Sequence, residues 1–138
     1  MFLDVGHSRS SSTTQTGGTG ADGVAIGNAP GSRPDGKRNE YYFNRDIAQA
    51  LGNILTEKGI PVKLVDYPAP VSSSERTKVR DEFIASQHDY AMFVSIHCDA
   101  NKSPDCGGSQ VDISSTGHAK SADLATKIAQ NLGKVIDA

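Results

Sequence analysis

The segment from Tyr90 to Ile96, YAMFVSI, limits the fold of this chain more than any other feature. It is a nearly continuous apolar run of strand length, and such runs are typical of strands covered on both faces in a parallel sheet. Other strand-like segments lie at 2–6, 61–66 and 109–113. Because helical patterns separate most of these segments, we predict a domain in which strands and helices alternate.

The first helical pattern follows a long polar stretch. Residues 8–37 consist largely of Gly, Ser, Thr, Asn and Pro, and a loop of this length in a compact domain is usually functional or disordered. After it, Asn39 is a good N-cap and Gly59 is a good C-terminal stop. Between these two positions the apolar residues recur at helical spacing, at Phe43, Ile47, Ala50, Leu51, Ile54 and Leu55.

Two further helices are predicted from local signals. Ser72 and Glu75 form a capping-box signature ahead of a helix that reaches about Gln87. An amphipathic pattern from Leu124 to Ile136 indicates the last helix. We therefore expect an α/β fold, a three-layer sandwich with a mainly parallel twisted sheet and helices on both faces, formed as one domain over residues 1–138.

Composition excludes several classes of partner. Fourteen Lys and Arg against sixteen Asp and Glu give a net charge of -2, which provides no overall attraction to nucleic acid or to an anionic membrane. No apolar segment approaches the roughly 20 residues that span a bilayer, and the N-terminus lacks the pattern of a signal peptide. We expect a soluble monomer. Cys98 and Cys106 could form a disulfide or remain free thiols, and the sequence favours free thiols modestly.

Two histidines directly follow apolar strands, namely His7 and His97. The carboxyl ends of parallel strands meet at one edge of a sheet, where ligand sites gather, so both imidazoles should lie at that edge. His88 and His118 fall among polar residues and are expected on the surface. Imidazole pairs are common zinc ligands, often together with a carboxylate.

Glu40 is the best candidate for that carboxylate. It lies in the first turn of the helix after the long loop, and a right-handed crossover brings this turn beside the end of the first strand. An acidic residue in a first helical turn also complements the helix dipole, so a purely structural role stays open. The sequence thus indicates a possible metal site made of His7, Glu40 and His97.

Several segments resemble one known family. LDVGHS is similar to the DPGHGG element of the zinc-dependent N-acetylmuramoyl-L-alanine amidases of amidase type 3, found in bacterial cell-wall hydrolases and phage endolysins. ADGVAIGN resembles the DxGAxGN loop of that family, NEYYFNRDIAQAL its Glu-x-x-x-Asn helix start, and FVSIHCDAN its FVSIHANA strand end. SADLATKIAQNL is similar to its SxxLAxxIxxxL helix, so the resemblance covers most of the chain in the family's order.

The resemblance implies one zinc ion per chain, with His7, Glu40 and His97 as ligands. It also implies cleavage of the amide bond between N-acetylmuramic acid and L-alanine, at the bacterial cell wall. The partner would be peptidoglycan, with its glycan strand and stem peptide. The alternative is a non-catalytic peptidoglycan-binding or regulatory module that keeps the fold and the metal site.

Two roles in that family have no single match here. The family has a second, catalytic glutamate on a late strand, which is expected beyond Ala138, so no catalytic acid or base is assigned. The resemblance thus implies that residues 1–138 are an amidase-like catalytic domain that is incomplete at its C-terminal end. An arginine usually precedes the SIH element by about four helical turns. Arg76 and Arg80 both suit that position, and the sequence does not choose between them.

Overall fold

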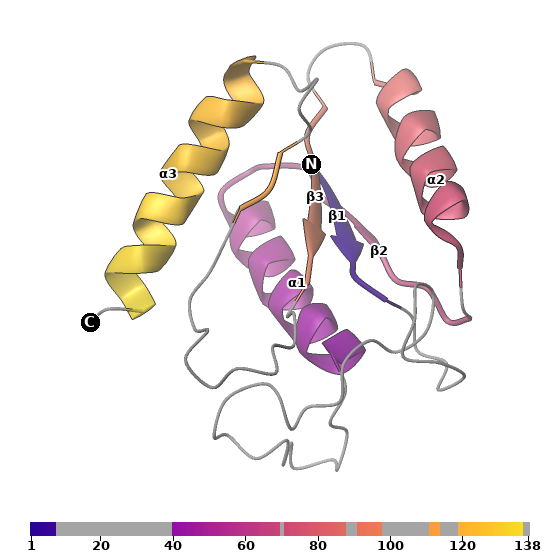
Figure 1. The fold of residues 1–138 in the computed structure, drawn as a ribbon, viewed down its shortest axis with the longest axis horizontal. Coiled ribbons are helices and arrows are strands. Elements are labelled where there is room, and N and C mark those ends of the chain that lie inside the picture. The colour runs from indigo at the N-terminus through magenta and orange to yellow at the C-terminus, as the bar shows by residue number, and fades with distance from the viewer. Residues whose placement is uncertain (8–39, 70, 88–90, 98–110, 114–118, 137–138) are drawn as a thin grey trace. The chain divides into compact units, whose positions relative to one another are not determined.

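The computed structural model describes residues 1–7, 40–69, 71–87, 91–97, 111–113 and 119–136 (Figure 1). The chain divides into two compact units, Met1–Ala100 and Asn101–Ala138, which are described separately. The first unit holds β1 (Phe2–Val5), α1 (Glu40–Glu57), β2 (Lys63–Val65), α2 (Ser73–Ala85) and β3 (Phe93–Ile96), and the second holds α3 (Ala119–Ile136). No helix in the described ranges is both long and apolar enough to cross a membrane.

The sheet of the first unit is parallel, with the strand order β2-β1-β3. Leu3 of the central strand is in register with Leu64 on one side and with Val94 on the other. This arrangement confirms the predicted α/β class with parallel strands. The larger three-layer sandwich and the single domain remain predictions.

One face of β1 packs against α2. Successive side chains of a strand point to opposite faces, so Phe2 and Asp4 share a face. The ring centroid of Phe2 lies 4.8 Å from that of Phe83 in α2. Arg76 of the same helix pairs with Asp4. An aromatic contact and an ion pair therefore join the helix to this face.

The opposite face of β1 packs against α1. Val5 forms a fully buried cluster with Tyr41 and Ala48 of that helix. A Cβ added at Gly52 would lie 3.7 Å from Leu3 Cδ1, an ordinary packing distance. Since α1 and α2 contact alternate side chains of β1, the two helices cover opposite faces of this strand.

The C-terminus of α1 confirms the predicted stop. Gly59 has a positive φ of 78°, which glycine adopts at little cost. The amide of Ile60 donates to Leu55 O at 2.9 Å and that of Gly59 donates to Thr56 O at 2.9 Å. This pair of bonds is the Schellman motif, which satisfies carbonyls that have no partner within the helix. The predicted N-cap, Asn39, lies outside the described residues.

The predicted apolar face of α1 is partly wrong. Ile47 and Ile54 are 48% and 50% exposed, whereas Tyr41, Asn44 and Ala48 are buried. The buried stripe thus includes a polar residue that a hydrophobic pattern assigns to solvent. The Asn44 amide donates to Gly6 O at the end of β1. Because this hydrogen bond satisfies the amide, Asn44 can be buried on the helix face that contacts the sheet.

Two strand predictions also need correction. Residues 93–96 of β3 are only partly buried, and Ser95 is exposed, although the apolar run predicted coverage on both faces. Within the described residues β3 pairs with β1 alone, so it lies at an edge of the sheet. Residues 111–113 form no strand, and Ile113 is 47% exposed; Ser109 and Gln110 lie outside the described residues.

The capping box of α2 is confirmed. The backbone amide of Glu75 donates to Ser72 Oγ at 3.2 Å, and the Ser72 amide donates back to Glu75 Oε2 at 2.6 Å. These hydrogen bonds from Ser72 favour the ionised carboxylate and lower the pKa of Glu75 below its ordinary value. The helix therefore begins where the sequence predicts.

In the second unit, α3 confirms the predicted amphipathic helix. Ala125 is buried, and Leu124 and Ile128 are partly buried. Leu132, on the same apolar pattern, is 38% exposed. The helix begins at Ala119, ahead of the first apolar position of the pattern.

Candidate metal centre

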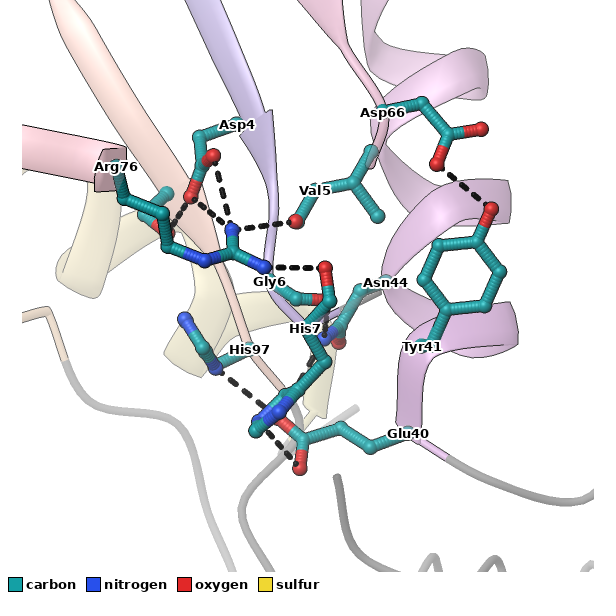
Figure 2. A network of polar contacts seen from close by, with 11 residues as sticks. Asp4, Val5, Gly6, His7, Glu40, Tyr41, Asn44, Asp66, Arg76 and His97 are labelled. Carbon is teal, nitrogen blue, oxygen red and sulfur yellow. Dashed lines mark hydrogen bonds and ion pairs between the residues drawn. The ribbon is translucent and has the colours of Figure 1, made fainter. Parts of the chain in front are cut away.

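Glu40 joins the two predicted histidines through both of its carboxylate oxygens (Figure 2). His7 Nε2 lies 3.2 Å from Glu40 Oε2, and His97 Nδ1 lies 3.1 Å from Glu40 Oε1. The two imidazole rings meet edge to face, with centroids 5.0 Å apart. Three segments that are distant in the sequence therefore meet at the carboxyl end of β1 and β3, as the sequence predicts.

The chemistry of this cluster fits a zinc ion. One nitrogen from each imidazole and one carboxylate oxygen lie within 4.8 Å of one another. Zinc bonds of roughly 2.0–2.1 Å in a tetrahedron place neighbouring ligand atoms roughly 3.3 Å apart. Each histidine nitrogen lies near that distance from a different oxygen of Glu40, 3.2 Å for His7 and 3.1 Å for His97, so the carboxylate lies between the two rings. A set of three protein ligands also leaves a fourth position for water or substrate, as catalytic zinc sites do.

Gly6 allows the close approach of the two strand ends. Its amide donates to Ile96 O at 3.0 Å. A Cβ at this position would lie 2.3 Å from Ile96 O and 2.7 Å from His97 Cε1. These distances are too short for any side chain, so only glycine fits between the two histidine-bearing strands. The sequence signal was the glycine directly before His7.

Asn44 supports both Glu40 and the chain before His7. Its Nδ2 donates to Gly6 O at 3.1 Å and to Glu40 Oε1 at 3.4 Å. Asn44 is one helical turn after Glu40, so both side chains lie on the same face of α1. This fully buried amide therefore orients the carboxylate between the two imidazoles.

Arg76, one of the two arginines between which the sequence does not choose, contacts the end of β1. Its guanidinium pairs with Asp4 and donates to two backbone carbonyls at the end of β1. Arg80 instead pairs with its neighbour Asp81, and both side chains are exposed. Choosing between the two arginines required knowing which helix face contacts β1, and this information is tertiary.

Tyr67 lies beside this ion pair. The Arg76 guanidinium carbon is 4.2 Å from the centroid of the Tyr67 ring. Burial, followed by the negative charge of Asp4, raises the pKa of Tyr67 from 10.0 to about 12. The phenol therefore stays protonated well above neutral pH.

A cavity of about 230 Å³ adjoins the two histidines on the α2 side of the sheet. Its walls include His7, His97 and Ser95 at the strand ends and Thr77 on α2. Both histidines therefore border this cavity.

Other residues singled out in the sequence lie outside the described part of the chain. They are the long loop 8–37, the histidines His88 and His118, and the cysteines Cys98 and Cys106.

The described residues form a parallel sheet with helices packed on it, and a His-Glu-His cluster lies at the carboxyl ends of its strands. These features define the class: an α/β protein with a candidate metal centre. The chain belongs to the N-acetylmuramoyl-L-alanine amidase family, whose family model matches residues 1–138. No curated protein and no solved structure matches the chain. Membership implies a hydrolase of the amidase type that acts on peptidoglycan of the cell wall.

Proposed function

We propose that this protein is a zinc-dependent hydrolase that cleaves the amide bond between N-acetylmuramic acid and L-alanine in peptidoglycan. One zinc ion would be held by His7, Glu40 and His97, in a three-layer α/β sandwich of the family type. The observation that carries the proposal is the convergence of these three side chains, with ligand atoms within 4.8 Å of one another, in a chain of this family. The protein would act at the bacterial cell wall.

Each residue of the centre has a defined task in this proposal. His7 presents Nε2 and His97 presents Nδ1 toward the same carboxylate, so each ring would offer the lone pair of that nitrogen and carry its proton on the other one. Glu40 supplies negative charge and is held by Asn44. When bound, zinc supplies Lewis-acid polarisation of the scissile carbonyl and makes water a stronger nucleophile near neutral pH.

Cleavage also requires a group that protonates the leaving amine. The family resemblance expects a second glutamate for this task. The reacting amide would reach the histidine pair through the cavity beside α2. A peptidoglycan-binding module without turnover is the alternative, and the family match does not favour it.

Release of stem peptide from purified cell walls tests the proposal. The full-length protein should release peptides with a free L-alanine amino group, because that amine is a product of the proposed cleavage. A chelator should stop the release and added zinc should restore it. Glu40→Gln keeps the size of the side chain and removes its charge, so it should lower the rate at least about 100-fold. Release that is insensitive to the chelator and to Glu40→Gln would refute the proposal.

A further inference from the structure

We propose that Arg76 is a positioning residue that holds His7 in the geometry required for metal binding. The inference rests on the metal site proposed above. It assigns to Arg76 a task in the centre although its guanidinium contacts none of the three proposed ligand atoms.

The contacts of Arg76 converge on the segment that carries His7 (Figure 2). Nη1 donates to Val5 O at 3.0 Å and to the carboxylate oxygens of Asp4 at 3.1 and 3.3 Å. Nη2 donates to the backbone carbonyl of His7. One guanidinium from α2 thus contacts the backbone at the end of β1 and the backbone of His7 itself.

The position of the guanidinium is itself strongly determined. The side chains of Arg76 and Asp4 are 17% and 4% exposed, so water screens this ion pair little. Ser95 Oγ of β3 donates to Asp4 Oδ2 at 2.6 Å. The Tyr67 ring lies against the guanidinium on another side. The pair therefore connects α2 with β1, with β3 and with the chain after β2.

His7 needs such support because of its backbone. It is the non-glycine residue with a positive φ, 67°, among the described residues. For residues other than glycine this conformation costs about 1 kcal/mol or more, and it persists only when surrounding contacts maintain it. The hydrogen bond from Arg76 to His7 O is such a contact. Without it, the backbone can relax toward negative φ, which would rotate the imidazole away from Glu40.

Lysine cannot replace the arginine in this role. The planar guanidinium reaches a carboxylate and two separate carbonyls at once, whereas an ammonium is a compact point charge on a flexible stem. Arg76→Lys therefore keeps the charge next to Asp4 and loses the fork that reaches His7 O. This difference separates a positioning role from simple charge neutralisation.

The test compares Arg76→Lys with the matched control Arg80→Lys, which lies one turn later on the same helix and pairs with exposed Asp81. The Kd for Zn²⁺ is measured by competition with a chromophoric chelator. Unfolding by urea is measured in excess EDTA, so that folding and metal binding are read separately. The visible spectrum of the Co²⁺-loaded protein reports the coordination geometry.

We expect Arg76→Lys to weaken Zn²⁺ binding by 10- to 100-fold, a range typical of residues that orient metal ligands. Its Co²⁺ spectrum should change, whereas Arg80→Lys should stay within about twofold of the parent Kd with an unchanged spectrum. A folded Arg76→Lys with the parent's Kd and Co²⁺ spectrum would overturn the inference. Failure of Arg76→Lys to fold in EDTA would also overturn it, because the residue would then be structural. Failure of the parent protein to bind Zn²⁺ would instead refute the metal site itself.

Discussion

The two histidines of the candidate centre lie at the ends of neighbouring parallel strands and are held in different ways. Each follows a parallel strand and faces one oxygen of Glu40. The His7 side chain is 17% exposed and its backbone is bound by Arg76. The His97 side chain is 43% exposed and follows β3, which pairs with β1 alone in the part of the chain that the structure describes. The centre thus has a half-buried part at His7, which Arg76 contacts, and a more open part at His97.

The two halves therefore differ in how strongly the surrounding residues support them. The His7 half combines a left-handed backbone with a hydrogen bond from the Arg76 guanidinium. The His97 half borders the cavity and the solvent. Changes in the His7 half should therefore affect both stability and metal binding, and changes farther away should affect stability alone.

The largest effect is expected where the two halves touch. Gly6→Ala would place a Cβ 2.3 Å from Ile96 O, so β1 and β3 would have to separate at the site. We expect a loss of about 2–3 kcal/mol in the free energy of unfolding, as for an overpacked core, together with loss of measurable zinc binding. Urea unfolding and zinc titration measure the two effects.

Gly52→Ala is the matched control for Gly6→Ala. Its Cβ would meet Leu3 and Val62 at 3.7 Å, and the residue lies within a helix. We expect stability to be unchanged or to rise by about 0.5–1 kcal/mol, because alanine favours a helix over glycine. Equal behaviour of the two variants would show that the strand ends are not tightly apposed at Gly6.

The next largest effect concerns Asn44. Asn44→Ala removes the donor to Gly6 O and to Glu40 Oε1, so it acts on both halves through the carboxylate. Zinc affinity should fall by about 10- to 100-fold and the free energy of unfolding by about 1–2 kcal/mol. Gln49→Ala, on the exposed side of the same helix, should change neither quantity. Unchanged affinity in Asn44→Ala would remove this residue from the support of the centre.

How much of this organisation the sequence predicts depends on whether the signal is local. The capping box at Ser72 and the glycine stop at Gly59 depend on neighbouring residues, and both are confirmed. The convergence of His7 and His97 is also predictable, since the ends of parallel strands share an edge. Glu40 followed from the crossover between strand and helix.

The errors arise where tertiary contacts outweigh pattern. The buried face of α1 includes Asn44 because an amide can be buried when it is hydrogen-bonded, a condition that hydrophobic periodicity does not register. β3 is apolar but has only one neighbouring strand in the described residues. Arg76 could not be distinguished from Arg80 without the contact between α2 and β1.

A smaller effect is expected at high pH, from the phenol beside the Arg76–Asp4 pair. The folded protein holds the Tyr67 proton up to about pH 12, whereas the unfolded chain releases it near the ordinary pKa of 10.0. Ionisation therefore favours the unfolded state, and stability present below pH 10 should be lost progressively between pH 10 and 12. Urea unfolding of Tyr67→Phe should lack this component of the alkaline decline. The same decline in both proteins would contradict the assignment.

The smallest effect is expected far from the centre, at the start of α2. Ser72→Ala removes the cap and should cost about 1 kcal/mol without changing zinc affinity. Because the folded-state pKa of Glu75 is lowered, the stabilisation by its carboxylate is present above the ordinary pKa of 4.5 and is lost as the pH falls through the folded-state value. The stability difference between the parent and Ser72→Ala should therefore shrink in acid. A change in zinc affinity in Ser72→Ala would contradict the claim that the start of α2 affects stability alone.

Zinc stoichiometry in three proteins tests the central claim most directly. The parent and His118→Ala should each bind one Zn²⁺ per chain, because His118 follows polar residues in the sequence and is not among the proposed ligands. His97→Ala should bind none, although it removes the more exposed of the two imidazoles. Elemental analysis after gel filtration measures all three. Equal zinc retention by His97→Ala and His118→Ala would contradict the assignment of the centre to His7, Glu40 and His97.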